Sequence, residues 1–209
     1  MTGFKIHRLQ KNCTALLIID MQNDFLHEEG YLGKVPEAGF NLKFRREAIP
    51  GIKRLAHATR QVGAPVIYCQ TMFEPDYADL GLPLDHMPRV RELGFIIEGT
   101  WGAQIVDELA PQKGDYVVEA KCFNKFDHTP LELILRNRGI KTVIFTGVGT
   151  NVCVESTFRA AVERGFQAII ASDATRAATP EFYRAGLDQI GFFFGAVMTC
   201  DQIIQLLMG

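Results

Sequence analysis

The sequence predicts a doubly wound α/β fold, a three-layer α/β/α sandwich around a mainly parallel six-stranded sheet. Six short apolar runs recur along the chain, each with the length of a strand that is buried on both faces. Helical patterns separate most of these runs, and alternating strands and helices build a sheet that helices cover on both sides. A chain of 209 residues is also typical of one domain, so we expect a single domain over residues 1–209.

The strand predictions rest on apolar runs that end in polar or small residues. The first run, CTALLIID, is apolar almost throughout and ends at Asp20. Such runs suit a parallel sheet, in which helices cover both faces of every strand. The six expected strands are 13–20, 65–71, 115–120, 142–147, 167–172 and 195–199.

Helix signals lie between these strands. Proline is favoured at the first helical position, and glycine is favoured just past the last one. Thr129-Pro130-Leu131-Glu132 has the pattern of a capping box, with Gly139 after the expected helix end. The remaining helices are expected from Pro50 to Val62, over 152–164, from Pro180 to Gly191, and in the apolar QIIQLLMG at the end of the sequence.

Two long stretches, 21–46 and 72–100, fit no regular element. Both follow the ends of expected strands, and ligands bind at the carboxyl ends of the strands in this fold class. Long loops in compact domains are often functional lids. We therefore expect both stretches to overhang the functional site.

Composition and charge narrow the range of partners. The net charge of −2 provides no basic surface for nucleic acid, and no apolar run reaches the roughly 18 residues of a membrane span. The five cysteines are scattered without a CxxC pair, which is typical of a reducing compartment. The polar stretch MTGFKIHRLQKN lacks the apolar region of a signal peptide. We expect a cytoplasmic protein with no nucleic-acid and no membrane partner.

Three residues at strand ends are candidates for catalysis. Asp20 follows the first strand, Lys121 follows the third, and Cys153 follows a glycine-containing turn after the fourth. If Asn151 caps the next helix, Cys153 lies in its first turn, where the helix dipole favours a thiolate. Each residue also has a structural interpretation. Asp20 could serve a turn, Lys121 could be a solvated lysine, and Cys153 could be a buried apolar residue.

The motifs ALLIIDMQNDF, GTWGAQIVDEL, TPLELILRNRGI and TGVGTNVCVEST, with ASDATRA after them, resemble those of the isochorismatase-like cysteine hydrolases. Within that family, these motifs are most similar to those of ureidoacrylate and biuret amidohydrolases. The resemblance implies a catalytic triad of Asp20, Lys121 and Cys153. It also implies a cis peptide at Val148–Gly149 and an oxyanion hole formed by the N–H groups of Gly149 and Cys153. It further implies a homo-oligomer, a dimer or a tetramer.

The sequence departs from the family pattern in two places that matter here. Metal-binding members carry paired histidines after the second strand, whereas this chain reads TMFEPDYADLG. We therefore expect no metal and no cofactor. The segment from Lys121 to Phe126 is one residue shorter than the commoner form, and Asn124 and Lys125 occupy the positions of two small residues.

The resemblance implies a cysteine-dependent amidohydrolase that cleaves a C–N bond of a small carboxamide or ureide through a thioester intermediate. Two alternatives are an enol-ether hydrolase of the isochorismatase type and a non-catalytic binding protein on the same scaffold. A place in the core is an equally good interpretation of each aromatic candidate for substrate contact. The candidates are Asn23, Phe25, Thr71, Phe73, Trp101 and Phe126.

Overall fold

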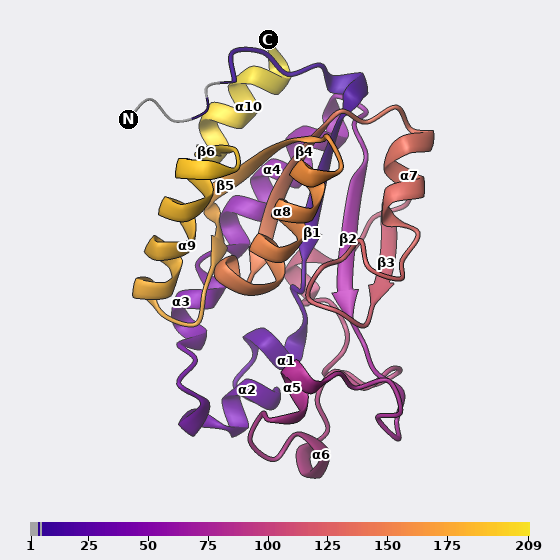
Figure 1. The fold of residues 1–209 in the computed structure, drawn as a ribbon, viewed down its shortest axis with the longest axis vertical. Coiled ribbons are helices and arrows are strands. Elements are labelled where there is room, and N and C mark those ends of the chain that lie inside the picture. The colour runs from indigo at the N-terminus through magenta and orange to yellow at the C-terminus, as the bar shows by residue number, and fades with distance from the viewer. Residues whose placement is uncertain (1–3, 5) are drawn as a thin grey trace.

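The computed structural model describes residue 4 and residues 6–209, and its centre is one parallel sheet (Figure 1). All six expected strands are present, in the order β3-β2-β1-β4-β5-β6, and every neighbouring pair is parallel. This confirms the predicted fold class. The assignment of residues 1–209 to one domain stays a prediction. The strands are β1 (Thr14–Ile19), β2 (Val66–Thr71), β3 (Tyr116–Ala120), β4 (Thr142–Val148), β5 (Gln167–Arg176) and β6 (Ala196–Met198).

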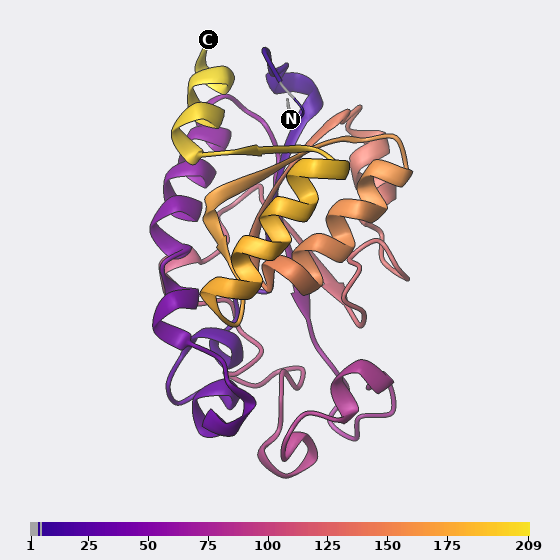
Figure 2. The same cartoon turned by 60° about the vertical axis from the view of Figure 1, so that its left-hand side comes forward.

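Helices cover both faces of the sheet, as Figure 2 shows. On one face lie α4 (Ile49–Gln61) and α10 (Cys200–Met208), and on the other lie α7 (Leu131–Asn137), α8 (Glu155–Glu163) and α9 (Pro180–Phe193). Strand β1 shows why its sequence is apolar throughout. Leu16 and Ile18 pack toward α4, while Leu17 and Ile19 pack toward α7 and α8.

Two residues that the sequence assigned to helix ends have other roles in the structure. Helix α9 continues through Gly191 to Phe193. A Cβ atom at residue 191 would lie 3.1 Å from the Val197 side chain, so this glycine permits close packing against β6 rather than ending the helix. The capping box at Thr129 does not form, because the Glu132 side chain binds Arg136 and Arg164 instead.

The two stretches without a predicted element fold into short helices beyond the carboxyl ends of the strands (Figure 1). The first holds α1 (Asn23–Leu26), α2 (Tyr31–Lys34), the 3-10 turn η2 (Pro36–Ala38) and α3 (Leu42–Arg46), and the second holds α5 (Leu82–Asp85) and α6 (Val90–Leu93). They share an apolar cluster of their own that includes Tyr31, Phe73 and Phe95. The two remaining 3-10 turns are η1 (Lys11–Cys13) and η3 (Asp107–Leu109).

The carboxylate of Asp24 holds these two stretches together. It accepts hydrogen bonds from the backbone N–H groups of Tyr31 at 2.8 Å and Ile96 at 2.7 Å. Burial raises the pKa of Asp24, and the two backbone hydrogen bonds offset this only in part. One buried side chain therefore joins α2 to the segment that follows α6.

We expect Asp24→Ala to lower the free energy of unfolding by about 2–4 kcal/mol, because two buried N–H groups lose their acceptor. Denaturant unfolding gives the value, and hydrogen exchange should show faster exchange at Tyr31 and Ile96. The matched control is Asp85→Ala, since the exposed Asp85 pairs with the exposed Arg91 at the surface. A loss for Asp24→Ala no larger than that of the control would contradict this role.

The last helix packs on its own chain. Cys200, Ile203 and Leu207 of α10 are buried against α4 and the sheet. The expected homo-oligomer stays a prediction. No helix within residue 4 and residues 6–209 has the length and apolar character to cross a membrane.

Candidate active site

The site lies where the strand order reverses, between β1 and β4. The chain leaves β1 toward β2 and returns to the other side with β4, and ligand sites in this fold class occur at such a switch point. Gly147 near the end of β4 has φ 116°, and a Cβ atom there would lie 2.0 Å from the Ile19 carbonyl oxygen. Only glycine permits this close approach, which brings the turn after β4 beside the end of β1.

Asp20 follows β1 in a left-handed conformation, with φ 54°, which is uncommon outside glycine and costs least for Asp and Asn. Its carboxylate is buried. The Oδ1 atom accepts hydrogen bonds from the backbone N–H of Thr71 at 3.1 Å and from its hydroxyl at 3.0 Å. The Oδ2 atom is buried without a hydrogen-bond partner, so it is available as a base.

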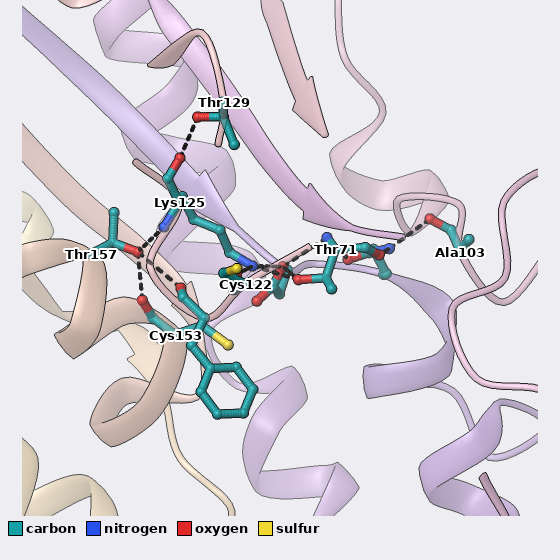
Figure 3. A network of polar contacts seen from close by, with 10 residues as sticks. Thr71, Ala103, Cys122, Lys125, Thr129, Cys153 and Thr157 are labelled. Carbon is teal, nitrogen blue, oxygen red and sulfur yellow. Dashed lines mark hydrogen bonds and ion pairs between the residues drawn. The ribbon is translucent and has the colours of Figure 1, made fainter. Parts of the chain in front are cut away.

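Lys125 is the cation that neutralises Asp20. Its ammonium lies 2.9 Å from Asp20 Oδ1, and its side chain has 0% exposure. It also donates to the Thr71 hydroxyl and, at 3.2 Å, to the Cys122 carbonyl (Figure 3). Burial alone lowers the pKa of Lys125, but the opposing effects, of which the negative charge of Asp20 is the largest, outweigh burial and raise the pKa above its usual value. The lysine is therefore charged at neutral pH.

The structure does not place Lys121 in this network. Its ammonium pairs with Asp79 at 2.7 Å, and its side chain is 36% exposed. The prediction of Lys121 as the lysine beside Asp20 is therefore corrected to Lys125. The physical reason is the path of the turns after β3. They direct the Lys121 ammonium outward to Asp79, and they place the Lys125 ammonium against Asp20, the Thr71 hydroxyl and the Cys122 carbonyl.

Backbone contacts hold Lys125 in this position. Its N–H donates to the Thr157 hydroxyl at 3.1 Å, and this hydroxyl donates to the Cys153 carbonyl at 2.6 Å (Figure 3). Its carbonyl accepts from the Thr129 hydroxyl at 2.6 Å. The sequence signal for Lys125 was a departure from the family resemblance, which would place a small residue at this position.

Cys153 lies in the π-helical turn η4 (Thr150–Val154) that precedes α8. Gly149, not Asn151, is the residue before this turn, and no side chain caps it. Burial, and then the negative charge of Asp20, raise the pKa of the Cys153 thiol far above its usual value. This is opposite to the thiolate predicted from a helix N-terminus, because burial and Asp20 outweigh the cations Lys125 and Arg45.

The turn before Cys153 also differs from the resemblance in one detail. The described residues contain no cis peptide bond, so Val148–Gly149 is trans, and Gly149 has φ 52°. Gly149 and Cys153 nevertheless line the same cavity. Their use as an oxyanion hole stays a prediction.

A cavity of about 360 Å³ opens at Cys153 between the sheet and the short helices. Of the six predicted substrate contacts, it brings together Phe25 and Thr71 with Cys153 and Gly149. Its other walls are mostly apolar and come from both overhanging stretches and the turn after β3. These residues, which the sequence did not single out, include Leu32, Phe40, Arg45, Met87, Phe95 and Phe123.

Four predicted contacts lie outside this cavity. Phe73 is buried in the apolar cluster of the short helices, and Phe126 stacks on Phe166 with ring centroids 6.1 Å apart. The Asn23 side chain donates to the Trp101 carbonyl at 2.8 Å. Trp101 is 45% exposed and borders a separate surface hollow beside His27. These aromatic residues were predicted from their types, which do not distinguish a cavity wall from core.

Among residues 4 and 6–209, no three side chains of His, Cys, Asp or Glu form a group that could hold a metal ion. The absence of a metal requirement stays a prediction.

Comparisons with known proteins show which family and fold this chain resembles. A sequence model described as "Isochorismatase domain" matches residues 14–202. A protein of Pseudomonas syringae pv. syringae named ureidoacrylate amidohydrolase RutB is 37% identical over 207 residues, which cover 93% of this chain and 83% of that protein. A protein of the same name from Methylorubrum extorquens is 38% identical, with 89% and 79% covered.

Solved structures show the same fold. A cysteine hydrolase from Pseudomonas syringae pv. phaseolicola superposes with a TM-score of 0.89 at 27% identity, with 100% of this chain and 98% of that chain covered. An N-carbamoylsarcosine amidase from Thermoplasma acidophilum has a TM-score of 0.70 at 27% identity, with 90% and 96% covered.

Proposed function

Because the chain belongs to the isochorismatase family of cysteine hydrolases, we propose that it is an amidohydrolase that cleaves a C–N bond of a small carboxamide or ureide. The observation that carries the proposal is the buried Asp20–Lys125 pair next to Cys153, which lines a mostly apolar cavity. The relatives named as ureidoacrylate amidohydrolases and as an amidase support the same chemistry.

The proposed reaction begins with a neutral thiol, because the pKa of Cys153 is raised. Asp20 has one oxygen without a hydrogen-bond partner, and it takes the thiol proton as the sulfur attacks the substrate carbonyl. A C–S bond forms, and the carbonyl oxygen becomes an oxyanion. We assign its stabilisation to the N–H groups of Gly149 and Cys153.

The tetrahedral species then collapses. The C–N bond breaks, and Asp20 returns its proton to the leaving nitrogen, which departs as ammonia or an amine. Water next attacks the thioester with Asp20 again as base, the acid product leaves, and the Cys153 thiol is restored. The Lys125 ammonium lies 2.9 Å from Asp20 Oδ1, and it stabilises the Asp20 carboxylate in the steps in which that group is deprotonated.

Product release tests this proposal directly. We expect ammonia from ureides and carboxamides, with ureidoacrylate among the substrates. Isochorismate should be assayed in parallel for pyruvate, which the alternative enol-ether hydrolase would release. Pyruvate without ammonia would favour that alternative, and release of neither product from a folded protein would favour a non-catalytic binding protein.

We expect activity to be independent of metal, because the sequence after β2 lacks the paired histidines of metal-binding members. Dialysis against a chelator should leave kcat unchanged within error. A loss of rate that zinc, iron or manganese restores would contradict the metal-free mechanism. Controls with chelator added directly to the assay separate metal removal from loss of folded protein.

A further inference from the structure

A second buried cation lies in the cavity and takes no part in the proposed proton transfers. Arg45 is at the end of α3, and only 3% of its surface is exposed. Its Nε donates to the Phe25 carbonyl at 3.1 Å. Its guanidinium lies over the rings of Phe25 and Phe40, at 5.7 and 5.3 Å from their centroids. These contacts fix the plane of the guanidinium at the cavity wall.

No carboxylate within residues 4 and 6–209 pairs with Arg45. Its terminal nitrogens make no hydrogen bond to a described residue, and they border the cavity instead of being sealed in protein. The neighbouring Arg46 differs in both respects, because its side chain is partly exposed and its guanidinium pairs with Glu108. Buried charges in proteins are normally paired, so Arg45 lacks the partner that its burial requires.

The charges around the cavity leave this cation uncompensated. Asp20 and Lys125 neutralise each other, and Cys153 is a neutral thiol because its pKa is raised. Burial lowers the pKa of Arg45 to about 10, so it remains charged at neutral pH. Attraction to an anion is strong where water is excluded, and the fork of a guanidinium matches a carboxylate with two parallel hydrogen bonds.

We propose that Arg45 binds the carboxylate of the substrate, so that the enzyme acts on a short ureido or amido acid rather than on a neutral ureide such as biuret. The assignment of the reacting end rests on the proposed function. Arg45 and Cys153 line one cavity of about 360 Å³, a size that fits a small molecule with a carbonyl at one end and a carboxylate at the other. The rings of Phe25 and Phe40 flank the guanidinium, so Arg45 presents its edge to the ligand.

The test compares 3-ureidopropionate with its methyl ester, which differ in charge and little in shape. Binding is measured by calorimetry on Cys153→Ala protein, so that turnover does not enter the result. We expect the acid to bind at least about tenfold more tightly than the ester, as expected for hydrogen bonds to a charged group. Adding Arg45→Met should remove this preference, and adding Arg45→Lys should retain part of it. Arg46→Met is the matched control and should leave the preference unchanged.

Equal affinity for acid and ester in Cys153→Ala protein would overturn the inference, even if Arg45→Met does not fold. A preference for the acid that survives Arg45→Met would also overturn it. In protein that retains Cys153, a lower kcat with an unchanged KM for Arg45→Met would overturn it as well, because Arg45 would then act on the transition state. A clear preference for the acid in a protein whose unaltered form releases no ammonia would instead contradict the proposed function and leave the carboxylate site standing.

Discussion

Cys153→Ala is expected to lower kcat by at least about a thousandfold, which corresponds to roughly 4 kcal/mol of activation free energy. The reason is that the proposed thioester cannot form without the sulfur atom. Ammonia release under saturating substrate gives the rate, and intact mass of acid-quenched enzyme should show the substrate-derived adduct only when Cys153 is present. Thermal unfolding should change little, because the substitution removes one atom beside an open cavity.

Cys200→Ala is the matched control for this prediction. Cys200 is also buried, and burial also raises its pKa, but it packs on the opposite face of the sheet. Its replacement should leave kcat within about twofold and cost roughly 1 kcal/mol of stability, in the usual range for a small core change. Near-normal turnover by Cys153→Ala would exclude covalent catalysis by this residue.

Lys125→Met is expected to have the second largest effect, on both stability and rate. Methionine fills a similar volume but leaves Asp20 buried without its cation, and breaking one side of a buried ion pair costs about 3–5 kcal/mol. An unpaired buried carboxylate also binds a proton more readily. Without its cation Asp20 serves less well as the general base, and loss of a general base lowers kcat by about a hundredfold or more. Denaturant unfolding and kcat are measured on the same preparations.

Lys121→Met provides the contrast that the corrected assignment requires. The Lys121–Asp79 pair is at the surface, where ion pairs contribute about 0–1 kcal/mol. We expect nearly unchanged stability and rate. The double variant Lys125→Met/Asp20→Asn should be more stable than Lys125→Met alone, because the unpaired charge is gone. Inactivation by Lys121→Met together with normal activity of Lys125→Met would restore the lysine suggested by the family pattern.

A large loss of rate and stability in Lys125→Met would show that Lys125, and not the Lys121 of the family pattern, is the cation that Asp20 requires. In this protein Lys125, four residues beyond Lys121, reaches Asp20 from the turns that follow β3. A buried carboxylate is normally paired with a cation within hydrogen-bond distance. The position along the chain from which that cation comes is less constrained.

The second buried cation bears on substrate choice rather than on the chemical steps. Arg45 is followed by Arg46 in the run KFRR, and a basic run on a short helix is usually solvated. Nothing in the sequence distinguishes the two arginines. Packing distinguishes them, because Arg45 lies over the rings of Phe25 and Phe40, whereas Arg46 points toward Glu108.

The sequence by itself determined the sheet, its six strands, and two of the three residues that the structure gathers at the switch point. Apolar runs buried on both faces specify a parallel sheet, and strand ends converge at one edge of it. Asp20 and Cys153 could therefore be placed from periodicity and position. These features depend on residues that are close along the chain.

Only the tertiary structure decided which lysine faces Asp20, which aromatic residues line the cavity, and in which direction the pKa of Cys153 is shifted. Lys121 and Lys125 are four residues apart, and the choice depends on contacts with Thr71, Thr129 and Thr157. The pKa of Cys153 depends on burial and on Asp20, which is distant in the sequence. Burial and electrostatic coupling arise from the whole fold, so local pattern does not contain them.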